Sequence, residues 1–186
     1  SLRLNSTGSC NVGVGYASLF DNTTGVQNTS IGSYSLANNT TANNNTAVGY
    51  LSLCSNTTGT VNTAIGRESL ICNTTGSSNT GLGSNALGRV TTSGCNTAVG
   101  HNSLFNNTAS NNTAIGYNSL VANTTGNRNV AVGNNTLLLN TTGLQNTAIG
   151  EGALCTNSTG NFNTGIGRVS LASNTTASSN TAVGYA

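Results

Sequence analysis

The chain has 186 residues, enough for one domain of ordinary size, and Asn (33), Thr (31) and Gly (24) together make up nearly half of it. Only 4% of the residues are charged, Lys, Pro, Met and Trp do not occur, and the formal net charge is +2. Such a charge is too small for an electrostatic nucleic-acid interface, no apolar run approaches the ~20 residues of a membrane span, and the composition argues against a soluble metabolic enzyme.

A 17-residue repeat, N-T-A-[VI]-G-Y-x-S-L-x-x-N-T-T-G-x-x, runs through the whole chain. With the first Asn as position 1, the repeats carry Asn at position 1, an aliphatic residue at 4, Gly at 5 and Leu at 9. One interval, from Asn96 to Asn112, has 16 residues because the loop at 107–110 is one residue short. The repeats begin at Asn11, Asn28, Asn45, Asn62, Asn79, Asn96, Asn112, Asn129, Asn146, Asn163 and Asn180.

Within the repeat that begins at Asn62, the elements follow in a fixed order. Residues 63–65 are a short alternating stretch that predicts a strand, Gly66 ends it, residues 68–71 predict a second short strand, and Asn73 to Gly76 have the residue types of a type I turn. A unit of 17 residues is too short for two helices, since helical repeats have ~33–47 residues. We therefore predict an all-β fold, a single parallel β-solenoid of about eleven coils over residues 1–186, with successive coils ~4.8 Å apart.

Stacking has to stabilise these coils. Burying one Leu and one Val or Ile contributes ~3–6 kcal/mol per coil, whereas ordering 17 backbones costs ~17–34 kcal/mol, so a coil cannot fold alone. Ladders of stacked Asn side chains would add amide hydrogen bonds between coils. The predicted core contains the residues at positions 9 and 4, represented by Leu19, Leu36, Leu53, Leu70, Leu104, Val48, Ile65, Ile115 and Ile149.

Asn-x-Ser/Thr sequons are the most informative chemical motif. A modified Asn at position 12 would form a column of glycans along one edge, because each coil holds at most one, and a glycan requires an exposed site. The alternative is that this Asn is only a turn residue, or part of an inward ladder that no enzyme reaches. The candidate glycosylation sites are Asn5, Asn22, Asn39, Asn56, Asn73, Asn123, Asn140, Asn157 and Asn174.

No catalytic or metal site is predicted. The three acidic residues and the single His101 lie on different coils, so no nucleophile, base and acid can be combined. The five Cys have no metal-ligand spacing and are interpreted as small apolar residues rather than as a disulfide framework. We expect no enzyme activity, no metal and no cofactor.

Two surface patterns leave binding alternatives open. Tyr recurs at position 6, where it could stack on sugars or on a partner, although other residues interrupt the column. Threonine arrays suggest ice binding, but Thr at position 2 would share its face with the aliphatic residue at position 4, which we expect to point inward. Alternation of strand side chains therefore argues against a regular threonine grid.

The length is close to a whole number of repeats, and the chain opens at repeat position 8 and closes at position 7. Neither end has a polar capping repeat, which a soluble solenoid needs to cover its strand edges. We expect copies to continue head to tail in a fibre, either as stacked subunits or as stretches of a longer chain. The alternative is that the boundary was chosen around an ordered region.

The unit N-T-A-I-G-Y-x-S-L-x-x-N-T-T-G resembles repeats of tail-fibre-like and adhesin-like proteins of bacteria and large viruses. It is more loosely similar to the N-[ST]-x-A-[IV]-G head repeats of trimeric autotransporter adhesins, which form left-handed parallel β-rolls. Residues 62–66 and 146–150 carry the likeness best. The resemblance implies a non-catalytic structural fibre or adhesin on a cell or virion surface, with other copies of itself as partners, in a head-to-tail polymer or a trimer. A carbohydrate-binding or receptor-binding fibre and an ice-binding protein are the alternatives.

Overall fold

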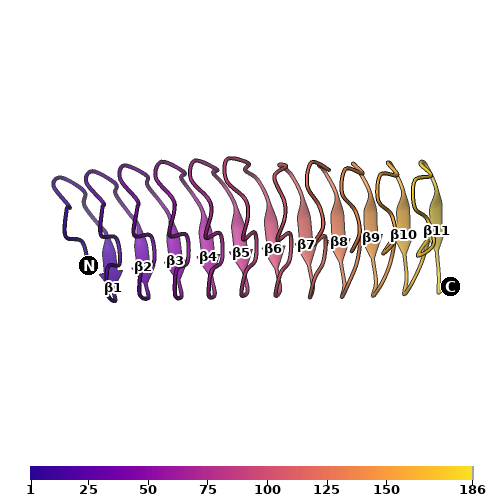
Figure 1. The fold of residues 1–186 in the computed structure, drawn as a ribbon, viewed down its shortest axis with the longest axis horizontal. Helices are drawn as coiled ribbons and strands as arrows, with labels where there is room; N and C mark the ends of the chain where they lie inside the picture. The colour runs from indigo at the N-terminus through magenta and orange to yellow at the C-terminus, as the bar shows by residue number, and fades with distance from the viewer. Residues whose placement is uncertain (186) are drawn as a thin grey trace.

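In a computed structural model, which describes residues 1–185, the chain forms a row of coils with one strand in each coil (Figure 1). The eleven strands form one sheet in chain order, and every neighbouring pair is parallel. The predicted all-β parallel β-solenoid is therefore confirmed. The strands are β1 (Val12–Val14), β2 (Thr29–Ile31), β3 (Thr46–Val48), β4 (Thr63–Ile65), β5 (Thr80–Leu82), β6 (Thr97–Val99), β7 (Thr113–Ile115), β8 (Val130–Val132), β9 (Thr147–Ile149), β10 (Thr164–Ile166) and β11 (Thr181–Val183).

The register of the sheet follows the sequence repeat. Each strand residue pairs with the residue at the same repeat position of the next coil, as Thr46 does with Thr63. At the 16-residue interval Thr97 pairs with Thr113, so the strand register is kept and the coil is one residue shorter in a loop outside the strand. Each strand position therefore forms an unbroken column along the rod.

The predicted second strand is wrong: residues 68–71 form turns. Glu68 and Leu70 have φ of 57° and 53°, in the left-handed region, and the same two positions have positive φ in the other coils. Left-handed residues reverse the chain direction and cannot continue an extended strand. The turns still bond to the next coil, because the N–H of Leu70 donates to the carbonyl of Ala86 at 2.9 Å. Parallel stacking thus continues around the coil without a second regular sheet.

The core is narrower than predicted. The leucines at position 9 are confirmed as core, since Leu19, Leu36, Leu53, Leu70 and Leu104 are fully buried. Their inward neighbours are the small residues at position 3, such as Ala47 and Ala64, at the centre of each strand.

The assignment of position 4 to the core is wrong. Ile65, Ile115 and Ile149 are exposed and Val48 is half-buried. In a three-residue strand the first and third side chains point to the same side and the middle one to the other. The middle residue points inward here, so the aliphatic residue at position 4 points outward together with the Thr at position 2.

Glycine at position 5 allows the coils to approach closely after each strand. Gly66 has φ of 126°, and a Cβ added there would lie 2.7 Å from the carbonyl carbon of Gly83 in the next coil. Neither this φ nor this distance is compatible with a side chain. The glycine column is therefore a condition of stacking.

Candidate functional site

A ladder of asparagine side chains at position 12 runs inside the rod. The Nδ2 of Asn39 donates to the Oδ1 of Asn22 in the preceding coil at 2.9 Å and to the carbonyl of Ala42 in its own turn at 3.1 Å. Asn56 bonds in the same way to Asn39 and Gly59. Each amide thus closes its own turn and fixes the adjacent coil.

The prediction of a glycan column at position 12 is therefore wrong for the interior coils. A glycan would replace a hydrogen of the Nδ2 that donates in the ladder, and it would have no space inside the rod. Asn5 is exposed and Asn174 is half-buried, but both also bond into the ladder. The fully buried candidates are Asn22, Asn39, Asn56, Asn73, Asn123, Asn140 and Asn157.

A second asparagine ladder occupies position 1. The Oδ1 of Asn45 accepts from the backbone N–H of Asn62 at 2.9 Å, and the Nδ2 of Asn45 donates to the carbonyl of Gly59 at 2.9 Å. That carbonyl also accepts from Asn56 of the first ladder. Where position 12 is Asn, the two ladders therefore meet at one acceptor and link the N-T-T-G turn to the adjacent coils.

Other polar side chains of the repeat also bond between coils. The hydroxyl of Ser52, at position 8, donates to the carbonyl of Ala64 at 2.8 Å, and the hydroxyl of Thr57, at position 13, donates to the carbonyl of Thr74 at 3.1 Å. Both bonds recur in most coils. The recurring polar residues of the repeat are thus structural.

The position-12 ladder is interrupted once, at Val90. This residue is fully buried where an Asn would donate to Asn73, and the Oδ1 of Asn73 has no hydrogen-bond partner. Asn107 resumes the ladder in the short coil, where its Oδ1 accepts from Asn123 at 2.7 Å. Alignment of the repeats is enough to find the interruption and its end, because Val90 and Asn107 both occupy position 12.

The outer face of the sheet, defined as the residues at positions 2 and 4 of β1–β11, is uncharged. Its position-2 column contains nine Thr and two Val, and its position-4 column is aliphatic throughout. The exposed fraction at position 4 is 37% for Ile65 and 55% for Val14. The argument against a threonine grid is therefore wrong, because the threonines at position 2 also face outward.

Position 6 borders this face beyond the glycine column, and its side chains interact along the rod. His101 stacks on Tyr117 with ring centroids 5.6 Å apart. The guanidinium of Arg168 bonds to Glu151 at 3.2 Å, and this hydrogen bond raises the pKa of Arg168. These contacts join neighbouring coils at the surface.

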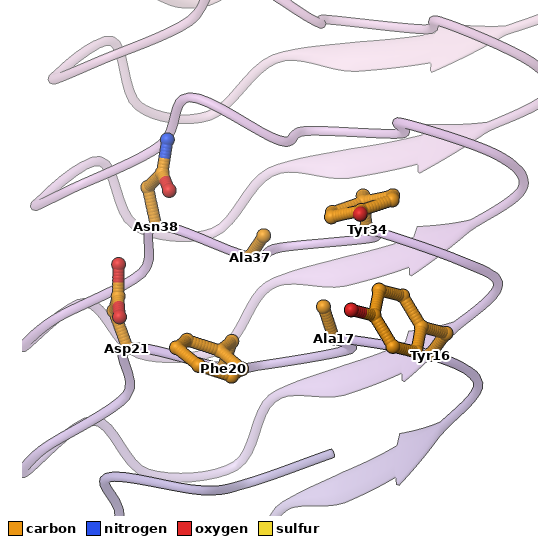
Figure 2. A pocket seen from close by; sticks show the side chains of 7 residues that line it. All are labelled: Tyr16, Ala17, Phe20, Asp21, Tyr34, Ala37 and Asn38. Atoms are coloured by element: carbon orange, nitrogen blue, oxygen red, sulfur yellow. The ribbon is translucent and has the colours of Figure 1, made fainter.

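A shallow hollow of about 200 Å³ lies between the first two coils (Figure 2). Tyr16 and Tyr34 line one end in an edge-to-face arrangement, with ring centroids 5.3 Å apart, and the nearby phenol of Tyr16 raises the pKa of Tyr34. Phe20, Asp21 and Asn38 line the other end. The hollow thus combines exposed aromatic faces with a carboxylate and an amide.

The cysteines and acids form neither a disulfide nor a metal-binding group within residues 1–185. All five Cys are free, and partial burial raises the pKa of the Cys54 thiol. No group of three or more His, Cys, Asp or Glu is placed to hold a metal ion in this part of the chain. Across the same residues, no helix has the length and hydropathy to cross a bilayer.

Comparison of the chain with protein-family models, with curated proteins and with solved structures gave no match.

Proposed function

We propose that this protein is a non-enzymatic structural element, the shaft of an extracellular fibre on a cell or virion surface. The observation that carries the proposal is the pair of asparagine ladders, which assign the recurring polar residues to contacts between coils. Because each coil contacts only its neighbours, a rod of this kind extends by the addition of further coils without a change in its cross-section. A surface with few charged residues suits exposure to water without attracting charged partners.

The experiment is immunogold labelling of the source material with an antibody raised against the purified rod. We expect gold along filaments outside the cell or on the virion. The control is an antibody raised against a scrambled peptide of the same composition, which does not recognise the stacked coils. Label confined to the cell interior would contradict the proposal.

Glycans on this fibre would attach at exposed sequons rather than at the ladder. Asn38, Asn44, Asn111 and Asn134 each precede an Asn-Thr pair and are exposed. Peptide mass mapping of native material before and after deglycosylation tests this, with the mass loss expected at these four residues. Glycans found on interior position-12 residues would contradict the ladder itself.

A saccharide-binding adhesin is the second candidate, and the hollow between the first two coils favours it. Sugar rings pack their C–H faces on aromatic side chains, and carboxylates and amides bond to their hydroxyls. Tyr16 is 71% exposed and Asp21 lies in the same hollow. On a glycan array, Tyr16→Ala and Asp21→Asn should each abolish binding, whereas Tyr117→Ala, at the same repeat position on another coil, should not.

Ice binding is the third candidate, favoured by the outward threonine column at ~4.8 Å spacing on a regular sheet. Thermal hysteresis of the purified protein is the test. A freezing-point depression that disappears in Thr63→Lys and persists in Thr57→Lys would favour ice binding, because only Thr63 belongs to the outer face. No hysteresis at millimolar protein would exclude it.

A further inference from the structure

The outer face of the sheet exposes an apolar column that the fold does not need. Position 2 and position 4 lie on the same strands and face the same side, so both have the same need for β-forming residues. Thr satisfies that need at nine of the eleven position-2 sites, yet position 4 is aliphatic at all eleven. Strand propensity therefore does not account for the aliphatic column.

The column is large enough for a stable interface. The exposed fraction of the eleven residues averages roughly two-fifths, so they present on the order of 800 Å² of apolar surface, more than the ~300–600 Å² of the largest patch on a typical monomer. This area matches the ~800 Å² that each partner buries in a standard protein–protein interface. The column contains Val14, Ile31, Val48, Ile65, Leu82, Val99, Ile115, Val132, Ile149, Ile166 and Val183.

The composition of the face favours another copy of the same chain as its partner. Its side chains repeat once per coil, at the ~4.8 Å strand spacing. A second copy of the chain has the same spacing, so the two faces can match along their whole length. Identical branched side chains on two such sheets interdigitate and exclude water, as in other sheet-to-sheet interfaces. Charged residues are absent from the face and occur beside it, as Arg67 and Glu151 do at position 6, which is the distribution of a dry centre with a polar rim.

We propose that the outer face of β1–β11 is the lateral interface between copies of this chain, which associate with their rod axes aligned. This inference rests on the proposed structural function and specifies how a shaft is built: several solenoids lie side by side, joined by the position-4 column. The threonines at position 2 flank the contact, where their methyl groups pack and their hydroxyls remain hydrated.

The test compares two triple variants by sedimentation equilibrium. Ile65→Thr/Ile115→Thr/Ile149→Thr places at position 4 the residue that the same strands already carry at position 2, so the sheet should persist. The matched control, Val61→Thr/Leu139→Thr/Phe162→Thr, changes three apolar residues that are more exposed than the three isoleucines and lie outside the strands. Far-ultraviolet circular dichroism verifies that both variants keep the wild-type β spectrum.

We expect wild-type protein and the control to sediment at an integer multiple of 18.5 kDa. The position-4 variant should associate at least ~100-fold more weakly, since each buried Ile that becomes Thr removes about a tenfold gain in affinity or slightly less. Wild-type protein that is monomeric at micromolar concentration, or a position-4 variant that associates as wild type does, would overturn the proposal. A monomer with thermal hysteresis would also overturn it and assign the face to ice.

The outcome separates this inference from the proposed function. A monomeric rod that immunogold labelling still locates on extracellular filaments leaves the structural role in place and removes the lateral interface. A lateral oligomer found only inside the cell would support the lateral interface and contradict the extracellular structural role.

Discussion

Replacing Val90 by Asn should stabilise the rod, because it repairs the one interruption of the position-12 ladder. The new Nδ2 would donate to the Oδ1 of Asn73, which has no partner, and to the carbonyl of Ser93, in the way that Asn73 bonds to Asn56 and Gly76. Val and Asn are similar in volume, so the buried site accepts the change without overpacking.

The magnitude follows from three contributions. Giving the buried Oδ1 of Asn73 a donor removes a penalty of about 1–3 kcal/mol, and further hydrogen bonds of the new amide add about 1 kcal/mol each. Loss of the buried Val side chain offsets this by about 2 kcal/mol. We expect a net gain of about 1–2 kcal/mol in the free energy of unfolding, which corresponds to a Tm increase of roughly 2–8 °C for a chain of this size.

The assay is thermal unfolding followed by circular dichroism at fixed protein concentration. Asn56→Val is the matched reverse substitution in an intact part of the ladder, where it would leave the Oδ1 of Asn39 without its donor. It should lower the free energy of unfolding by about 2–4 kcal/mol. Val90→Asn and Asn56→Val shifting Tm in the same direction would refute the reasoning.

Three further substitutions test other features of the coil by the same assay. Gly66→Ala should lower the free energy of unfolding by about 2–5 kcal/mol, because the new Cβ would overlap the next coil and the φ of 126° is unfavourable for Ala. Unchanged stability would contradict the close approach of the coils at this glycine. Leu70→Ala should cost about 2–5 kcal/mol through the cavity that it leaves in the core, and a loss below about 1 kcal/mol would mean that the leucine column is not the core. Val61→Asn should add about 0.5–1 kcal/mol, because Val61 is exposed at a φ of 59° that Asn tolerates better, whereas Val12→Asn, in a strand, should not stabilise.

The architecture could be predicted from the sequence because the repeat fixes the register. Eleven copies of one 17-residue unit leave stacking in chain order as the arrangement that pairs every copy with its neighbours, and columns of identical residues follow from it. The buried Leu at position 9 follows from the same alignment, since an apolar side chain that recurs at one place gains most from contact with its equivalents.

The direction of the position-4 side chain could not be predicted from the sequence. A strand such as Thr63–Ile65 offers only two choices, and hydrophobicity favours the inward placement of Ile65. The structure places Ala64 inside, where it packs in one cluster with Leu70, and every strand has a small residue at this position. That packing depends on left-handed backbone at Glu68 and Leu70, which neither residue type signals.

The same limit applies to the position-12 asparagines. A sequon and an inward ladder both fit the sequence N-T-T, so the sequence alone does not distinguish them. The burial and hydrogen bonds of Asn39 and Asn56 show that these residues form the ladder. The exposed sequons recur at no regular interval, since Asn44 and Asn111 both precede a position-1 Asn but Asn38 and Asn134 lie elsewhere in the repeat. Glycan attachment therefore has no periodic signal in this chain.

The central claim is that the rod consists of stacked coils whose position-12 asparagines point inward and whose position-4 aliphatic residues point outward. Cryo-electron microscopy of the native filament at side-chain resolution tests it most directly. We expect one 17-residue coil per ~4.8 Å of rise, continuous density along the Asn ladder, and the aliphatic column against another copy. Position-12 asparagines that face solvent and carry glycans, or aliphatic side chains that fill the centre of the coil, would contradict the account.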